Sequence, residues 1–593
     1  YNCTWYGSKT TEHCSTSSKF NTFVSDIQLR DLWFELPDAR TGGGTIFVNW
    51  VGYRGYNVRN VKVEGCHFEN VGGVYITHAR RIYGNYNASV TANSDPDIDP
   101  ANTAGFGDTV ADLNQNIVFN NNTLFMPICS DGYKVLTQML RVEFVAGVRA
   151  SGNVSTRGAM SGWGGNAQMT NGGELQHYRR LRDVIFQHND LLEPNAMYFI
   201  CGENSVMIDN VIESCIDVGY DFEGCINCVA ALNDVENTAN GSLSVFYDSY
   251  KNTFSDNTCI EDGSIEDIND EFNLGTKWDP ANNETFFLNT GVHTPSDGED
   301  ESLVTRNTFI WEGTTGSGFI DARDVSRLII RDNEFENVCI KTASNNTGQV
   351  IIEDNSLAFT RDARREALIF VGDNRINTAG PIVEGNTVAI SAAQTNGSGG
   401  ASYIEKCFQG DNGNWINEIA GNTFGITGSG AIAGDIALLN QSVNAGRVHT
   451  CIITDNVLGT DYPLVELSAR NFPFVIYLAN NTHSGNNAIT WEYASAVLGD
   501  DKGIGFLSGT QLPSQTSGGK VAINDGIWLS SAYAWHSGTH SQGDLVYNSD
   551  GRVYWRTSTG TSTTEPAGNY PANWIYLGVN QTGVGDLIQW GNM

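Results

Sequence analysis

The sequence predicts an all-β chain wound as a right-handed parallel β-helix, with a small C-terminal β domain. The first observation is that asparagines recur at positions 189, 210, 233 and 257, each just after a short apolar run. A period of about 20 to 25 residues built of short strands is typical of a solenoid, in which each repeat buries its face by stacking on the next. The second observation is composition. Gly numbers 65 and Pro only 13, and long amphipathic helical stretches are scarce, which favours strands joined by many turns.

The asparagine ladder extends well beyond these four positions. Most rungs read apolar, apolar, polar, Asp or Gly, Asn, any, apolar; they fall at Asn122, Asn153, Asn189, Asn210, Asn233, Asn257, Asn307, Asn333, Asn355, Asn386, Asn422, Asn456 and Asn481, with Cys66 in the first place. Asn accommodates left-handed backbone angles at a tight corner. Its amide can also bond main-chain groups of the coils above and below, as in cross-β ladders. Regular leucines and helical returns are not visible, so a leucine-rich repeat is not predicted.

The ladder divides the chain into four segments. Residues 1–60 are expected to cap the open end, residues 61–485 to form the β-helix, residues 486–519 to connect, and residues 520–593 to form an aromatic-rich β domain. Insertions at 86–116, 154–173, 258–305, 387–418 and 423–449 break the period and are expected to project as loops on one face. The step of 50 from Asn257 to Asn307 holds either one faint coil or one long insertion, and its composition favours a loop.

Charge and cysteine usage narrow the classes of function. A net charge of −33 makes nucleic acid and anionic membranes poor partners, and the sequence holds no run of 18 apolar residues that would predict membrane insertion. The 12 cysteines mostly fall beside apolar residues and are expected to be reduced core residues. Cys225 and Cys228 are not followed by a second ligand pair at zinc-finger spacing. No metal and no cofactor are therefore expected.

Two acids stand on alternate positions of one predicted strand, between two ladder asparagines. Asp221 and Glu223 lie twelve and ten residues before Asn233, with Phe222 between them. Alternate strand residues face opposite sides, so Phe222 should point inward and the acids outward. The same offsets in other coils give the pairs Arg141/Glu143, His177/Arg179, Tyr198/Ile200, Val245/Tyr247 and Asp321/Arg323, with Phe199 and Phe246 inside. The outward pairs should line a groove, walled by the insertion that carries Trp163 and by the one at 258–305.

The acid pair matches the needs of glycoside hydrolysis, which uses one carboxyl group as acid and one as base or nucleophile. Two residues apart on one strand, the Cα atoms of Asp221 and Glu223 are about 6.5–7 Å apart, which leaves retention or inversion open. When two carboxyl groups lie this close together, the charge of one raises the pKa of the other. Asp217, Asp248 and Glu143 are nearby alternatives. Against this stands the interpretation that the pair are solvated surface acids, and that His177 and Arg179 pair with local acids rather than with a sugar carboxylate.

The motif DVGYDFEGCINC at 217–228, together with the ladder, resembles bacteriophage tailspikes and capsule depolymerases of the pectate-lyase-like β-helix class. The segment around residues 533–578 resembles small chitin-binding-type carbohydrate modules; a β domain with its own aromatic core, or one that clamps a trimer, is the alternative. The resemblance implies a homotrimer, a bacterial surface polysaccharide as substrate, and a place on the virion tail. The chain begins at Tyr1 without a signal-like segment, so we expect that an N-terminal region for attachment to the virion is missing.

The resulting hypothesis is an endoglycosidase that hydrolyses capsule, exopolysaccharide or O-antigen during host recognition. Glu223 would be the acid and Asp221 the base or nucleophile, with Asp248 beside them. His177, Arg179, Tyr198, Tyr247, Glu143, Trp163 and Asp217 would bind the substrate. A polysaccharide lyase that uses Tyr247, Arg179 or His177 as its base, and an adhesin that only holds glycan, are the alternatives.

Overall fold

The computed structural model describes most of the strand-forming segments of the chain. These are residues 23–36, 46–48, 51–78, 110–127, 135–165, 170–171, 174–175, 181–246, 249–264, 284–290, 301–314, 316–322, 328–342, 350–361, 367–371, 382–392, 406–410, 418–426, 439–441, 449–458, 465–467, 474–479, 482–483, 489–491, 496–499, 533–540, 545–547, 549, 552–556, 558–567 and 573–579. They fall into two compact units, residues 1–338 and 339–593.

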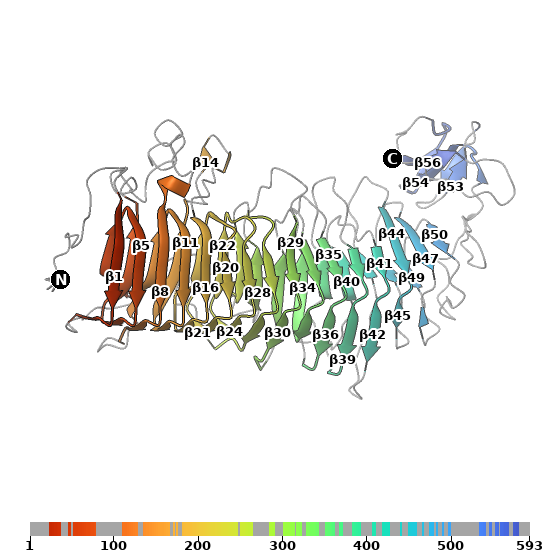
Figure 1. The fold of residues 1–593 in the computed structure, drawn as a ribbon. Helices are drawn as coiled ribbons and strands as arrows, with labels where there is room; N and C mark the ends of the chain where they lie inside the picture. Colours follow the sequence, from red (N-terminus) through yellow and green to blue (C-terminus); the bar gives the residue numbers. More distant parts are fainter. Residues whose placement is uncertain are drawn as a thin grey trace. The chain divides into compact units, whose positions relative to one another are not determined.

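In the first unit each coil supplies one strand to each of three parallel sheets, here called A, B and C (Figure 1). Sheet A contains β1 (Val24–Arg30), β5 (Val58–Glu64), β8 (Asn114–Asn120), β11 (Val145–Ser151), β16 (Leu181–Gln187), β19 (Gly202–Glu203), β20 (Val206–Ile208), β23 (Val229–Ala231), β26 (Thr253–Ser255), β29 (Ser302–Thr305) and β32 (Leu328–Arg331). Sheet B contains β2 (Trp33–Glu35), β6 (His67–Glu69), β9 (Thr123–Phe125), β12 (Val154–Thr156), β17 (Asp190–Leu192), β21 (Val211–Cys215), β24 (Asp234–Thr238), β27 (Thr258–Glu261), β30 (Thr308–Trp311) and β33 (Glu334–Glu336). Sheet C contains β3 (Ile46–Val48), β4 (Val51–Tyr56), β7 (Gly72–Thr77), β10 (Val135–Glu143), β13 (Gly158–Trp163), β18 (Met197–Ile200), β22 (Tyr220–Glu223), β25 (Leu243–Phe246), β28 (Glu284–Thr290) and β31 (Ser317–Ala322).

Three short elements complete the described part of the first unit. A 3₁₀ helix spans Val110–Asp112. An antiparallel pair joins β14 (Thr170–Asn171) and β15 (Glu174–Leu175). The fold is a right-handed parallel β-helix, as the sequence predicts.

The second unit repeats the same three-sheet winding and adds the C-terminal domain. Its sheets contain β35 (Val350–Glu353), β38 (Ile382–Glu384), β41 (Glu418–Ala420), β44 (His449–Thr454), β47 (Phe474–Ala479) and β50 (Ala496–Gly499); β36 (Ser356–Phe359), β39 (Thr387–Ile390), β42 (Thr423–Ile426), β45 (Val457–Leu458) and β48 (Thr482–His483); and β34 (Val338–Thr342), β37 (Ala367–Val371), β40 (Lys406–Gly410), β43 (Leu439–Gln441), β46 (Val465–Leu467) and β49 (Ile489–Trp491). The C-terminal domain has a sheet of β51 (Tyr533–Ala534), β53 (Leu545–Tyr547), β54 (Arg552–Arg556) and β56 (Trp574–Val579), and a pair of β52 (Gly538–His540) with β55 (Gly560–Ser562). In this domain Tyr554 is fully buried against Val546 with Trp535 packed on them, so part of its aromatic content forms its own core.

The interior is filled by side chains from alternate strand positions, stacked from coil to coil. Phe186, Phe199, Phe222 and Phe254 form one such stack, with ring centroids 5.1, 6.0 and 5.2 Å apart in that order. Burying each ring stabilises the fold by roughly 1.5–3 kcal/mol. Seven described cysteines are also buried and form no disulfides among the described residues, as expected: Cys66, Cys201, Cys215, Cys225, Cys228, Cys259 and Cys339.

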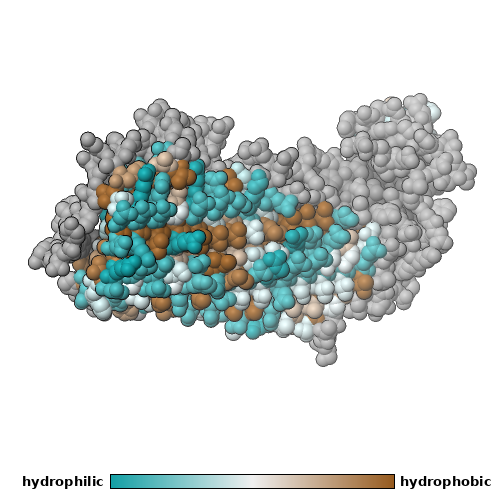
Figure 2. Space-filling view, in the orientation of Figure 1, coloured by the Kyte–Doolittle hydropathy of each residue, from teal (hydrophilic) through white to brown (hydrophobic). Residues whose placement is uncertain are grey.

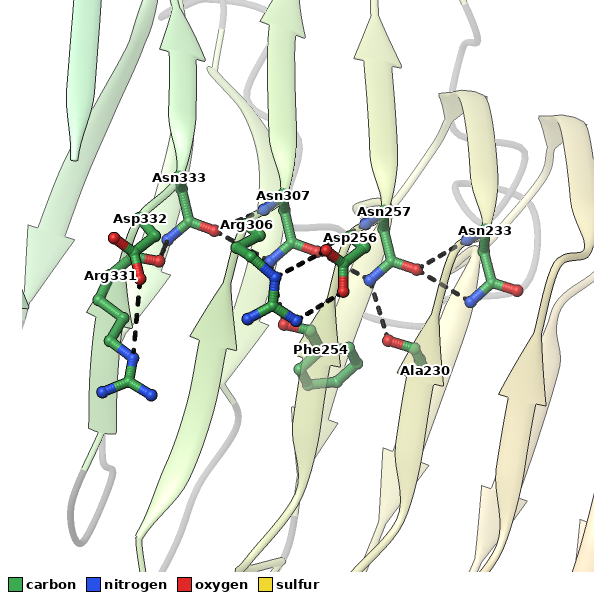
Figure 3. A network of polar contacts seen from close by, with 10 residues as sticks. All are labelled: Ala230, Asn233, Phe254, Asp256, Asn257, Arg306, Asn307, Arg331, Asp332 and Asn333. Atoms are coloured by element: carbon green, nitrogen blue, oxygen red, sulfur yellow. Dashed lines mark hydrogen bonds and ion pairs between the residues drawn. The ribbon is translucent and has the colours of Figure 1, made fainter. Parts of the chain in front are cut away.

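The ladder asparagines are buried and bonded to one another across coils (Figure 3). The Oδ1 atom of Asn257, for example, accepts bonds from the main-chain N and the Nδ2 of Asn233, at 3.0 and 2.9 Å. Its own Nδ2 donates to Oδ1 of Asn307 at 2.8 Å and to the carbonyl of Ala230 at 2.9 Å. All four bonding positions of the amide are thus used inside the protein, which avoids the cost of burying an unpaired polar group.

The left-handed backbone at each corner falls on the residue before the ladder asparagine, and this corrects the prediction. Asp209, Leu232, Asp256 and Arg306 have φ of +53°, +55°, +57° and +53°, whereas the ladder asparagines have no positive φ. The preceding residue turns the chain, and the asparagine then directs its amide inward to the ladder. Outside the corner, Arg306 makes a two-bond ion pair with Asp256, at 2.8 and 2.7 Å (Figure 3).

Several predicted boundaries differ from the structure. The sheets begin at Val24, because β1, β2 and β4 pair in register with β5, β6 and β7, ahead of the predicted start at residue 61. The expected insertion at 154–173 opens with two regular strands, β12 and β13. The strands β8, β39, β40, β42 and β43 likewise lie within or reach into other expected insertions. The reason is that a strand of sheet B follows each ladder asparagine directly, so asparagine spacing alone cannot separate strand from loop.

The step of 50 residues is a single coil with a long insertion, as the composition favoured. Asn257 bonds directly to Asn307, and β26 pairs directly with β29. The insertion nevertheless contains β28, which pairs with β25 and β31 in sheet C. The expected cap residues 1–22 and 37–45, the rung at Asn481 and most of the predicted connector lie outside the described residues.

Candidate active site

Strand β22 holds the two predicted acids on the outer face of sheet C. Phe222 is fully buried and stacks between Phe199 and Phe254 in the core. Because side chains alternate along a strand, Asp221 and Glu223 on either side of Phe222 point outward, as the sequence predicts. Asp221 is 8% exposed and Glu223 is half-buried, so the pair lies at the surface without being fully solvated.

The strand register defines the neighbours of this pair. Asp221 stands in an outer column that contains, in coil order, Arg54, Tyr75, Arg141, Ser161, Tyr198, Asp221, Ser244, Asn289 and Asp321. A parallel column beside it contains Glu143, Trp163, Ile200, Glu223 and Phe246. Adjacent members of a column are about 4.8 Å apart. The structure therefore brings together, on one face, residues separated by up to 267 positions (321 minus 54) in the chain.

The register corrects two predicted rungs. Strand β13 lies between β10 and β18, so Ser161 and Trp163 occupy the places predicted for His177 and Arg179. In the coil after β22, Val245 lies opposite Phe222, and Phe246 stands beside Glu223 instead of stacking inside. The cause is one extra residue between Phe246 and Asn257, which shifts the count by one and exchanges the two faces. His177, Arg179, Tyr247, Asp248 and Arg323 lie outside the described residues.

The two acids have different electrostatic surroundings. Burial, together with the nearby charge of Asp217, raises the pKa of Glu223 to about 7. Asp217 precedes β22 and accepts a bond from Nδ2 of Asn240 at 2.7 Å. Asp221 instead accepts a bond from the hydroxyl of Ser244 in the next coil, at 2.5 Å. Near neutral pH Glu223 can thus hold a proton while the Ser244 hydroxyl orients the carboxyl group of Asp221.

Toward the N-terminus, guanidinium and aromatic groups from both columns form a set here called the Arg–aromatic row: Arg54, Tyr75, Arg141 and Tyr198 from the column of Asp221, and Trp163 from the column of Glu223. The Arg54 guanidinium lies 4.8 Å from the centroid of the Tyr75 ring. Arg141 lies 5.2 Å from the same ring and 4.3 Å from the ring of Trp163. Trp163 meets Tyr198 edge-on, at 5.7 Å between centroids. Such cation–π contacts fix planar groups side by side at the surface.

Glu143 is buried against Arg141 and does not face solvent. This corrects the prediction that Glu143 binds the substrate directly. Its carboxylate has no exposed surface. It pairs with Nε and Nη2 of Arg141 at 2.7 and 2.6 Å, and accepts a bond from the hydroxyl of Thr77 at 2.5 Å. Both nitrogens bond the same carboxylate oxygen, Oε1, and these charge-assisted bonds hold the Arg141 guanidinium in place, so Glu143 positions Arg141.

Sequence reasoning missed Arg54, Tyr75, Ser161 and Ser244. Arg54 lies twelve residues before Cys66, the first place of the ladder, so the same offset could have found it, whereas Tyr75 lies at no such offset from a rung. Ser161 and Ser244 have no chemistry that marks them without the register. The only available signal was the alternation of polar and apolar residues in MSGW and LSVF, which is weak in strands of this length.

No group of three or more His, Cys, Asp or Glu side chains that could hold a metal ion occurs among the described residues. In the same part of the chain, no helix is long and apolar enough to span a membrane.

Comparisons with known proteins give a likeness among solved structures only. No protein-family model matches the sequence, and no curated protein sequence matches it. Among solved structures, the chain is similar to a variant of the tailspike protein of E. coli bacteriophage HK620, with 12% sequence identity over 77% of this chain and 74% of that chain and a TM-score of 0.32. The assignment of this chain to the parallel β-helix fold rests on its own strand pairings.

Proposed function

We propose that the protein is a bacteriophage tailspike endoglycosidase that hydrolyses a bacterial surface polysaccharide: capsule, exopolysaccharide or O-antigen. The observation that carries the proposal is the outward pair on β22, in which Glu223 has a pKa of about 7 and Asp221 is held by Ser244. A carboxyl group that can hold a proton near neutral pH, with a second carboxyl group beside it, is what glycoside hydrolysis requires.

In this mechanism Glu223 gives its proton to the glycosidic oxygen as the bond between that oxygen and the anomeric carbon breaks. Asp221 then acts in one of two ways: it takes a proton from the water that attacks the anomeric carbon, or it attacks that carbon itself and water later releases the sugar. Burial favours the protonated form of Glu223 in the resting protein. Asp248, on the next coil of the chain, remains a predicted assisting residue.

The test is depolymerisation by Glu223→Gln and Asp221→Asn variants on a panel of purified bacterial polysaccharides. Loss of a general acid or of its partner is expected to lower the release of reducing ends by at least a hundredfold. Glu236→Gln and Asp234→Asn are matched controls, because both acids are exposed on the outer face of sheet B within the same coil, and they should keep full activity.

The products of the reaction distinguish the glycosidase from the lyase and the adhesin. Full activity of both test variants would reject the proposed pair. Products with an unsaturated, ultraviolet-absorbing end would identify a lyase instead. If the parent chain binds polysaccharides but shortens none of them, the protein is an adhesin.

We also propose that the chain assembles as a homotrimer on the virion tail and attaches through a region N-terminal to this sequence. An apolar column on the outer face of sheet A supports self-association: in register, it contains Ile185, Val206, Val229, Thr253 and Leu303. On the face drawn in Figure 2, apolar residues likewise gather in a band bordered by hydrophilic ones. Contiguous apolar surface of this kind marks interaction sites in soluble proteins.

A further inference from the structure

The Arg–aromatic row lies on the same outer face as the acid pair but on the N-terminal side of it. From Arg141 to Asp221 the column passes three strand steps, or about 14 Å, and from Arg54 about 24 Å. A polysaccharide chain laid across the coils to reach Asp221 and Glu223 therefore passes over the row. What the row binds decides which polymer can be cut.

The geometry of the row distinguishes between a neutral and a charged sugar. A neutral sugar packs on the open face of an aromatic ring, but the strands of Arg54 and Arg141 flank that of Tyr75, so the two guanidiniums cover its ring from either side. The Trp163 ring likewise lies between Arg141 and the edge of Tyr198. The rings are occupied in holding guanidiniums, so the row presents N–H donors rather than ring faces.

The charge of the row also favours an anion. Arg54 and Arg141 bring two guanidiniums to the row, and Glu143 pairs with that of Arg141 from a fully buried position. The side chain of Arg141 remains 20% exposed, and Arg54, Tyr75, Trp163 and Tyr198 are all partly exposed. On a chain whose net charge is −33, a fixed pair of guanidiniums is a local site where a carboxylate meets attraction instead of repulsion. A planar guanidinium matches a carboxylate through two parallel hydrogen bonds.

We propose that the Arg–aromatic row is a recognition site for a carboxylate-bearing sugar, such as a uronic acid, and that the polymer cleaved at Asp221 and Glu223 is acidic. The part that names the cleaved polymer rests on the proposed function; the binding site does not. The charged sugar would sit about three coils from the cleaved bond, so it fixes the register of the polymer and takes no part in bond breaking.

The experiment measures binding by the full chain carrying Glu223→Gln, so that bound polymer is not cut. The probes are acidic bacterial capsular polysaccharides, each compared with its own carboxyl-reduced form, together with neutral polysaccharides. At least one acidic polymer should bind, and reduction of its carboxyl groups should raise the Kd at least tenfold. Arg54→Gln should raise the Kd for the acidic form and leave that for the reduced form unchanged. Arg149→Gln, which removes an exposed arginine from the outer face of β11, is the matched control and should change neither.

A second variant protects the test against misfolding. Arg141→Gln alone would leave the buried carboxylate of Glu143 without its ion-pair partner, so it is combined with Glu143→Gln. The double variant should fold, unfold cooperatively on heating and lose the discrimination between acidic and reduced polymer. Equal binding of the acidic and the carboxyl-reduced polymer by the chain that carries only Glu223→Gln would overturn the inference. Binding of neutral polymers only would overturn it as well.

Failure of this inference can be told apart from failure of the proposed function. If the parent chain shortens a neutral polysaccharide, the glycosidase stands and the acidic site is wrong. If it binds acidic polymers through Arg54 but shortens none, the site stands and the glycosidase is wrong.

Discussion

Two glutamates, Glu223 and Glu261, have their pKa raised to about 7, in each case chiefly by burial. Glu223 sits at the outer surface beside Asp217, where a proton can be passed to a substrate. Glu261 is 1% exposed and accepts three bonds: from the main-chain N and the hydroxyl of Thr238 at 2.7 and 2.6 Å, and from the hydroxyl of Ser242 at 2.6 Å. In the proposed function the raised pKa of Glu223 serves catalysis, whereas that of Glu261 affects stability.

For Glu223 the consequence is an alkaline limit to activity. A general acid must be protonated, so kcat/KM on a cleaved polysaccharide should fall about tenfold per pH unit above a pKa of about 7. Asp217 is the second cause of the raised pKa, so Asp217→Asn should move this limb to lower pH. The check is the pH profile of kcat/KM for both proteins. An alkaline limb that does not move in Asp217→Asn would contradict the assignment of Glu223 as the acid.

For Glu261 the consequence is a pH-dependent stability. Its pKa is raised from 4.5 in the unfolded chain to about 7 in the folded one, so the folded state holds the proton longer. Stability is therefore unaffected below about pH 4.5 and falls as the pH rises to about 7, by roughly 3 kcal/mol in total. Glu261→Gln removes this contribution, and the hydroxyls of Thr238 and Ser242 can rotate to accept from the new amide. The variant should match the parent in thermal midpoint near pH 4 and exceed it near pH 8; parallel curves would contradict this.

At the scale of single residues, the sequence predicted which way the side chains of β22 point, but not which groups surround them. The alternation in Tyr220–Glu223 was enough to place Phe222 inside and both acids outside. The hydroxyl of Ser244 was not predictable, because it comes from another coil and lies one residue off the counted offset, so it meets the site only through the register. The raised pKa of Glu223 depends chiefly on burial and then on the charge of Asp217, and the degree of burial could not be predicted without the fold.

Among the elements of the fold, the asparagine ladder ties the corners of successive coils together. Asn233→Ala would leave the main-chain N and the Nδ2 of Asn210 without their acceptor, and the Met207 carbonyl without its donor. Each unpaired buried group costs about 1–3 kcal/mol, so the variant should lose at least about 3 kcal/mol. Asn233→Asp keeps the acceptors but cannot donate, and should be as severe.

The stability of the Asn233 variants is compared with that of the parent through the midpoint of thermal or urea unfolding. Thr258→Ala, a half-buried outer-face substitution on β27 of sheet B, is the control and should stay within about 0.5 kcal/mol of the parent. If Asn233→Ala unfolds like this control, the ladder is not a stabilising element.

At the left-handed corner, one substitution is expected to raise the stability of the fold instead of lowering it. Leu232 has φ +55° and is 56% exposed, and a side chain with a Cβ pays roughly 1–2 kcal/mol for that conformation. Asn tolerates it better through local hydrogen bonds, so Leu232→Asn should stabilise the fold by about 0.5–1 kcal/mol. Val211→Asn, at a position that is 42% exposed but lies on a strand of sheet B, should not. A loss of stability in Leu232→Asn would show that the Leu232 side chain contributes more than its backbone costs.

The elements also show where counting from the asparagines fails. A rung of fixed length predicts the inner residue correctly at Phe199 and Phe222. It fails at Phe246, because one added residue before Asn257 exchanges inside and outside, and it fails at His177 and Arg179, because β13 already supplies that rung. Both failures arise from variable loops between fixed strands, which a period of asparagines does not report.

For the whole molecule, the fold class was predictable because many weak repeats add up, whereas the surface used for assembly was not. Two outer faces carry apolar residues. On sheet B, Val154 and Val211 are 49% and 42% exposed, but Asp190 and Asp234 alternate with them in register. Pressing that face against another copy would bury unpaired carboxylates, which is strongly unfavourable.

On sheet A the column from Ile185 through Val206 and Val229 to Leu303 contains no charged residue. We therefore expect sheet A to form the trimer contact. Replacing Ile185, Val206 and Val229 together by Lys should give a monomer, because six added ammonium groups would face each contact between two copies. Light scattering on the eluting protein measures the mass. Replacing Val154 and Val211 by Lys on sheet B is the matched control and should leave the three-chain mass unchanged, whereas a parent that elutes as a monomer, or a sheet A variant that keeps the three-chain mass, would refute this interface.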